Sequence, residues 1–195
     1  AVAGVGLAEE GAFPGVAAAS AAAARPGDGE AMNWRRVMHH LVASDLTVRR
    51  AFPAPALRAI EQAITESERG RHGEICFALE AALPLIPLLR AQSARERAIE
   101  VFSRLRIWDT ERNSGILIYL LLADHDVEIV ADRGIASRVS HSEWEAICHE
   151  METAFRDGRF QEGALAAIQR TSELLAAHFC AVEKENELPD RPIVL

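Results

Sequence analysis

The residues best suited to chemistry in this sequence are oxygen donors that flank two apolar runs. Asp109, Glu111 and Asn113 precede the first run, and Asp132 follows the second. If the runs pair as antiparallel strands, the start of one and the end of the other meet at one end of a sheet. Hard cations such as Ca²⁺ and Mg²⁺ prefer several oxygen ligands, usually including carboxylates. These four residues are therefore a candidate metal site, and the alternative is a solvated acidic surface in a chain with 29 Asp and Glu residues.

Other polar groups carry weaker signals. Asp124, His125 and Asp126 separate the two apolar runs, and a turn is favoured over a site there because aspartate tolerates turn geometry. His39 and His40 are adjacent on a predicted helix, so they do not share a face as i, i+4 ligands would, and we expect them to be solvated. No GxSxG, Walker A, GxGxxG or HExxH motif occurs in the sequence, and no nucleophile or two-metal cluster of a phosphatase is recognisable.

Charge and cysteine content restrict the partners and the compartment. The net charge of −8 argues against nucleic acid as a partner, because phosphate contacts need clustered Lys and Arg. It also disfavours binding to anionic lipid through the whole surface, but it does not exclude a local basic patch. Cys76, Cys148 and Cys180 are widely spaced and form no CxxC pair. The first two lie in apolar patterns and are expected to be buried, which predicts a reducing compartment and a cytoplasmic location.

The N-terminal part of the chain differs from the rest. Residues 1–31 are rich in Ala and Gly without an apolar period, which predicts a flexible arm. This arm makes a poor signal peptide because no basic region precedes it. No run in the chain approaches the roughly 20 apolar residues of a transmembrane helix.

Residues 32–52 are predicted to form an amphipathic helix and a linker, with Asn33 as the N-cap. We expect the apolar side of this helix to pack on the domain and its basic side to face solvent. The alternative is a helix that binds a membrane surface or a partner. The apolar side comprises Trp34, Val37, Met38, Leu41 and Val42, and the basic side comprises Arg35, Arg36, His39 and His40.

Three runs in the middle of the chain predict a sheet. Residues 74–81 alternate as in a strand, and residues 115–122 are apolar on both faces, as in a central strand covered on both sides. Residues 127–131 follow after a linker too short for a crossover helix, which predicts an antiparallel hairpin.

Amphipathic helices surround these strands. Ser93 with Glu96 is predicted to cap the second of them in a capping box, and Ser142 is predicted to cap the third. Helices around a strand that is buried on both faces predict an α/β fold of three layers, an α/β/α sandwich. The predicted helices cover residues 55–69, 93–105, 142–155 and 162–179.

The hairpin and its flanks resemble those of the TPM-domain family. Asn113-Ser114-Gly115 leads into the first run, and Asp132-Arg133-Gly134 follows the second, as in the signature hairpin of that family. The helix from Trp144 to Phe155 and its Phe-x-x-Gly connection at Phe160 are also similar to the family pattern, and Trp108 fits the end of the upstream helix. The resemblance covers residues 53–179.

This resemblance implies a mixed, mostly four-stranded sheet, with Gly115 and Gly134 shaping the backbone at the strand ends. The family is functionally mixed. Plant members of the thylakoid lumen are associated with photosystem II repair, an animal branch assists a receptor channel, and many bacterial members are membrane-tethered or exported. Some members bind a divalent cation, and an acid-phosphatase activity is ascribed to the family. Asn113-Ser114-Gly115 replaces the frequent Asp-Asn-Gly, so one carboxylate is missing.

We predict a non-catalytic accessory or interaction module for membrane-associated complexes, with a protein as its partner. The alternative is a weak acid phosphatase that uses Ca²⁺ or Mg²⁺ at the four oxygen donors named first and acts on phosphomonoesters. The expected organisation is a flexible arm at 1–31, the amphipathic helix and linker at 32–52, a TPM-like domain at 53–180 and an extended tail at 181–195.

Overall fold

The computed structural model describes residues 17–20, 34–69, 73–179 and 186–195 of the chain. Its mixed sheet has the strand order β1-β4-β3-β2-β5. The predicted hairpin of β3 and β4 is confirmed, with Ile118 opposite Ile129 in antiparallel register, while β2 runs parallel to β3. The strands are β1 (Ala17–Ser20), β2 (Glu74–Glu80), β3 (Gly115–Leu121), β4 (Asp126–Ala131) and β5 (Ile193–Val194).

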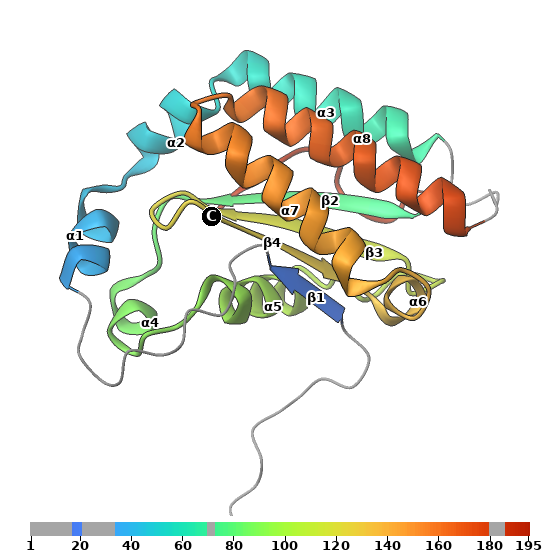
Figure 1. Ribbon diagram of the computed structural model, residues 1–195, viewed down its shortest axis with the longest axis horizontal. Coiled ribbons are helices and arrows are strands. Elements are labelled where there is room, and N and C mark those ends of the chain that lie inside the picture. The colour runs from blue at the N-terminus through green and yellow to red at the C-terminus, as the bar shows by residue number, and fades with distance from the viewer. Residues whose placement is uncertain (1–16, 21–33, 70–72, 180–185) are drawn as a thin grey trace, which may run out of the picture.

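Helices cover both faces of this sheet. Figure 1 shows α3, α7 and α8 over one face and α5 against the other, so the α/β/α sandwich is confirmed. The small helices α1, α2 and α4 lie at one side of the sandwich. The helices are α1 (Trp34–Val42), α2 (Asp45–Ala51), α3 (Ala54–Glu68), α4 (Leu85–Leu89), α5 (Ala94–Arg104), α6 (Arg133–Ala136), α7 (His141–Arg156) and α8 (Phe160–His178).

Every residue of β3 is buried, because successive side chains of this strand enter two different cores. Ile116, Ile118 and Leu120 pack in the larger core beneath α3, α7 and α8. Leu117 and Tyr119 belong to the smaller core on the α5 side. A strand covered on both faces needs an apolar residue at nearly every position, as this sequence has.

The α5 side of the sheet also contains a buried ion pair. Arg97 on α5 donates to both carboxylate oxygens of Glu80 on β2, each at 2.9 Å. The Tyr119 hydroxyl donates to Glu80 Oε2 at 2.7 Å. Burial, together with the charge of Glu80, raises the pKa of Tyr119, so the hydroxyl remains a donor. These contacts join α5 to two strands, and we assign them a structural role.

The predicted capping box of α5 is confirmed, with Ser93 N donating to Glu96 at 2.8 Å. The cap predicted for α7 was wrong, because Ser140 and not Ser142 begins this helix, with Glu143 as its capping-box partner. Both serines precede a glutamate by three residues, so the sequence offered two caps. Only the start at Ser140 places buried Val139 and Trp144 at the two positions of a hydrophobic staple.

The segments predicted as an arm and a tail each contribute a short edge strand. Residues Ala17–Ser20 pair with β4, and Ile193–Val194 pair with β2. The rest of residues 1–31 lies outside the described residues, as do Asn33, predicted as an N-cap, and Cys180. Cys76 and Cys148 are buried, as predicted, and neither is part of a disulfide among the described residues.

Candidate functional site

Two of the four predicted oxygen donors meet at one end of the sheet. Asp132 N donates to the Gly115 carbonyl at 2.9 Å, which brings the end of β4 to the start of β3. Arg133 joins the two sides, because its Nε donates to Asn113 Oδ1 at 3.0 Å and its backbone N donates to Asp132 Oδ1 at 2.6 Å. We call Asn113, Ser114 and Asp132, with the glycines beside them, the strand-end cluster.

The two glycines of this cluster allow the backbones to approach closely. A Cβ atom on Gly134 would lie 2.5 Å from the Asn113 carbonyl oxygen, and one on Gly115 would lie 2.0 Å from the Ile107 carbonyl oxygen. Both separations are shorter than a carbon–oxygen contact permits. Asn113 itself has a φ of 53°, a left-handed conformation that asparagine tolerates better than most residues.

The other two predicted donors lie apart from the cluster on the exposed loop before β3. Asp109 pairs with Arg106 at 3.3 Å, and the backbone N of Glu111 donates to the carboxylate of Glu187 at 3.0 Å. Trp108, which the resemblance singled out, is 45% exposed and lies against the Arg106 guanidinium.

Asp132 is the most unusual group of the strand-end cluster. Its side chain is buried. Its Oδ2 has no hydrogen-bond partner, whereas Oδ1 accepts the hydrogen bond from the backbone N of Arg133. Burial raises the pKa of this carboxyl, and the hydrogen bond and charge of Arg133 only partly oppose that shift. Ser114 Oγ is also buried without a partner. Within the described ranges, however, no group of three or more His, Cys, Asp or Glu side chains is placed to hold a metal ion.

The second candidate region is α1, whose orientation is the reverse of the predicted one. Arg36 and His40 point inward to Asp124, the turn residue between β3 and β4. Arg36 donates to both carboxylate oxygens, with its terminal nitrogen 2.8 Å from Oδ2, and His40 Nε2 lies 3.0 Å from Oδ1. The prediction that His40 is solvated was therefore wrong, since only 4% of this residue is exposed.

Two backbone groups complete this attachment, and one of them fixes the tautomer of the histidine. Leu83 N donates to His40 Nδ1 at 2.9 Å, so the ring proton lies on Nε2 and is donated to Asp124. Arg36 also donates to the Gln92 carbonyl at 2.8 Å. Burial raises the pKa of Asp124, but the hydrogen bonds of Arg36 and His40 and the charge of Arg36 outweigh it and hold this pKa below its ordinary value.

The consequence is an exposed apolar surface. Trp34 is 67% exposed and Val42 is 74% exposed, whereas Val37 alone among the apolar residues of α1 is buried. The prediction that the apolar side packs on the domain was therefore wrong. We define the α1–α4 surface by its exposed apolar residues on three helices: Trp34, Met38, Leu41, Val42, Leu46, Leu85, Ile86 and Leu89.

One signal in the sequence points to this orientation. Arg36 and His40 are four residues apart and therefore share a helix face, which the prediction placed in solvent. A basic i, i+4 pair can form an inner face where it meets a carboxylate. The position of that carboxylate depends on the hairpin, which lies 88 residues further along the chain from Arg36.

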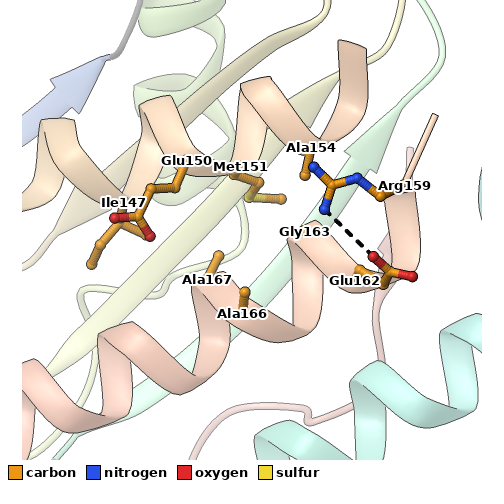
Figure 2. A pocket seen from close by; sticks show the side chains of 9 residues that line it. All are labelled: Ile147, Glu150, Met151, Ala154, Arg159, Glu162, Gly163, Ala166 and Ala167. Carbon is orange, nitrogen blue, oxygen red and sulfur yellow. Dashed lines mark hydrogen bonds and ion pairs between the residues drawn. The ribbon is translucent and has the colours of Figure 1, made fainter. Parts of the chain in front are cut away.

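A cavity of about 210 Å³ lies between α7 and α8. Figure 2 shows its floor of small and apolar side chains, which include Met151 and Ala167, and the ion pair of Arg159 with Glu162 at one end. This volume is below the roughly 300 Å³ at which small-molecule pockets begin. Because Arg159 is also paired with Asp157 at 2.9 Å, the cavity presents no unpaired cation to a ligand.

The residues that match a known protein family are nearly those of the sandwich. Residues 51–174, from the end of α2 to the last turns of α8, match the TPM domain. The chain belongs to the TPM-domain family. The NMR structure of BA42 protein from the psychrophilic bacterium Bizionia argentinensis is similar, with a TM-score of 0.65 and 28% sequence identity over 74% of this chain and 95% of that one. No curated protein matches the chain.

The two candidate regions differ in their position relative to the residues that match the TPM domain. The strand-end cluster lies inside the matched residues, whereas α1 and all but the last residue of α2 precede them. The α1–α4 surface therefore combines a helix of the TPM domain with an N-terminal addition to it. Within the described residues, none of the helices combines the length and apolar character needed to cross a bilayer.

Proposed function

We propose that this TPM-domain protein is a non-catalytic accessory module that docks on a membrane-associated complex through the α1–α4 surface. The observation that supports the proposal is the orientation of α1, whose polar side is bonded to the domain and whose apolar side faces outward. Several exposed large apolar side chains on neighbouring helices of a folded domain commonly indicate an interaction site. Trp34 is the side chain best suited to anchor such a contact, because large aromatic residues dominate binding energy at interfaces.

The attachment of α1 favours a docking surface over a loosely held helix. Hydrogen bonds orient α1 before any partner arrives. They join Arg36 and His40 to Asp124 and to the backbone groups of Leu83 and Gln92. A surface that is already ordered loses less conformational entropy on binding. The contacts thus stabilise an arrangement that leaves apolar side chains in water, which is useful only when those side chains are later covered.

We also propose a cytoplasmic location. Cys76 and Cys148 form no disulfide in the described part of the chain, as in proteins of reducing compartments. Burial and the nearby charge of Glu68 raise the pKa of Cys76 to about 12, so this thiol is protonated and unreactive at neutral pH.

Co-sedimentation with native membranes tests the docking proposal. The informative protein is a double variant, Met38→Gln with Leu41→Gln, which keeps good helix formers while removing two exposed apolar side chains. Trp108→Gln is the matched control, because Trp108 is an exposed apolar residue outside the α1–α4 surface. We expect the wild type and the control to sediment with the membranes and the double variant to remain in the supernatant. Equal sedimentation of all three proteins would refute the proposal.

The second candidate function is a divalent-cation-dependent phosphatase at the strand-end cluster. It is favoured by the buried Asp132 Oδ2, which has no hydrogen-bond partner and could serve as a cation ligand. Titration calorimetry with Ca²⁺ and with Mg²⁺ tests this function, with Asp132→Asn as the variant and Asp157→Asn as an exposed control. This function would be supported if the cation binds the wild type and Asp157→Asn but not Asp132→Asn, and if the wild type hydrolyses a generic phosphomonoester in a chelator-sensitive way. No heat of binding to either ion would exclude it.

A further inference from the structure

We infer that the partner of the α1–α4 surface is lipid, namely the interface of an anionic bilayer. This inference rests on the proposed function and names the docking partner within it. It is carried by the combination of two features on one side of the molecule, an ordered apolar surface and a local excess of arginine.

The charge of this region is opposite to that of the whole chain. Residues 34–50 and 84–95 together contain six arginines and one acidic residue, Asp45, in a protein with a net charge of −8. The next acidic residues after Arg95 are Glu96 and Glu100 on α5, which are exposed. Arg36 is paired with Asp124, and the other five arginines are exposed: Arg35, Arg49, Arg50, Arg90 and Arg95. A local basic patch attracts anionic headgroups within about 10 Å of the surface, whatever the net charge of the protein.

The order of side chains around α1 is that of a helix lying in a membrane interface. Consecutive residues are rotated by about 100° in an α-helix, so Trp34, Met38, Leu41 and Val42 form one continuous arc. Arg35 and His39 are exposed on the flank of that arc beside Val42, while the bonded residues lie on the opposite side. Apolar residues with Trp on one arc and basic residues at its edge are typical of interfacial helices.

The helix α4 extends this arrangement. The segment that contains it is bonded to α1 at both ends, through Leu83 N to His40 and through the Gln92 carbonyl to Arg36. α4 therefore lies close to α1, and Val37 of α1 and Leu88 of α4 belong to the same buried core, while Leu85, Ile86 and Leu89 are exposed. Figure 1 shows the two helices next to each other at the same side of the sandwich.

The same charge distribution disfavours a second copy of the chain as the occupant. A two-fold interface places the same surface on both partners, so the exposed arginines of one copy would face those of the other. Like charges brought together in this way weaken association, as they do between mismatched partners. An anionic headgroup layer places opposite charges at the same positions. Trp34 at the centre of the arc suits the level of the headgroups, where indole rings are enriched.

Flotation with vesicles tests the inference. The probes are vesicles of phosphatidylcholine alone and vesicles with one third phosphatidylglycerol, each with the full chain. We expect binding to be about tenfold or more tighter to the anionic vesicles, and to weaken when salt shortens the screening length. Emission of Trp34 should shift to shorter wavelength on binding, measured in a Trp108→Phe background in which Trp144 is already buried.

Two variants separate the apolar and the charged contributions. Met38→Gln with Leu41→Gln should abolish the emission shift, and Arg35→Glu with Arg90→Glu should remove the preference for anionic vesicles. The matched controls, Trp108→Gln and Arg58→Glu on the exposed side of α3, should bind as the wild type does. Binding that is equal for both vesicle types would overturn the inference.

The outcomes also distinguish this inference from the proposed function. If native membranes bind the wild type but neither vesicle does, the lipid inference fails and a membrane protein becomes the partner. If neither native membranes nor vesicles bind, both proposals fail. Sedimentation velocity tests whether a second copy of the chain is the partner. The inference would be overturned if the protein self-associates without binding vesicles and the double variant, Met38→Gln with Leu41→Gln, abolishes that self-association.

Discussion

Two helices of this protein have similar amphipathic sequences and opposite orientations. In α7 the apolar residues face the sheet, and Trp144 and Met151 are each 1% exposed. In α1 the apolar residues face water, and Arg36 and His40 face the protein. An apolar stripe therefore shows that a helix is amphipathic, but it does not tell which of its sides is the inner one.

The difference arises from what each helix meets. The inner side of α7 lies on the apolar face of the hairpin, near Ile129, where burial of side chains gains about 25 cal/mol per Å². The inner side of α1 meets the Asp124 carboxylate after β3, a backbone donor after β2 and a backbone acceptor between α4 and α5. Covering those groups with apolar side chains would leave them without hydrogen bonds, which costs more than an unburied stripe on a short helix.

The largest effect should come from exchanging the two tryptophans for alanine. Trp144→Ala in α7 should lower the free energy of unfolding by about 3–5 kcal/mol, because it leaves a cavity in the larger core. Trp34→Ala in α1 should change it by no more than about 0.5 kcal/mol. Urea unfolding followed by circular dichroism measures both. A comparable loss for the two variants would show that α1 also packs through its tryptophan.

Removing the carboxylate that holds α1 should have the next largest effect. Asp124→Ala leaves Arg36 and His40 without their acceptor, so the free energy of opening α1 should fall by about 1–3 kcal/mol. Amide hydrogen exchange on α1 measures this opening. Asp157→Ala is the control, because Asp157 and Arg159 form an exposed pair of little energetic value. Unchanged protection of α1 in Asp124→Ala would contradict the proposed attachment.

Acid should weaken the attachment of α1 more than the packing of α7 on the sheet. The pKa of Asp124 is lowered from its ordinary value of 3.8, so its contribution is complete above that value and is lost as the pH falls through the lowered folded-state pKa. We expect exchange protection of α1 to fall below pH 3.8, while that of α7 persists. The variant Asp124→Asn should show weaker protection that does not change over this interval. An identical pH profile in the variant would show that another group titrates.

The smallest effect concerns the start of α7. Ser140→Ala should reduce stability by about 1 kcal/mol, because it removes the N-cap of the helix. Ser142→Ala should stay within about 0.5 kcal/mol of the wild type, since Ser142 lies inside the helix. Thermal unfolding of the two variants compares the cap in the structure with the one that the sequence suggested. The reverse order of stability would restore the original prediction.

Part of the fold and of the strand-end cluster follows from local patterns. The apolar run of β3, the short turn to β4 and the capping box at Ser93 each depend on neighbouring residues alone. Asn113 and Asp132 were expected to meet because antiparallel pairing brings their strand ends together, and they do. The edge strands β1 and β5 were not predicted, because they pair through backbone groups and carry no apolar alternation.

The sequence by itself determined the family, the sandwich and the burial of its central strand, because periodic burial and short connections leave few alternative arrangements. Only the tertiary structure decided which side of α1 faces outward. That choice depends on Asp124, Leu83 and Gln92, which are distant from α1 in the sequence and contact it only in the folded arrangement of the hairpin and the segment between β2 and α5. Hydrogen-bond partners of this kind are set by the position of folded elements, and no local pattern records them.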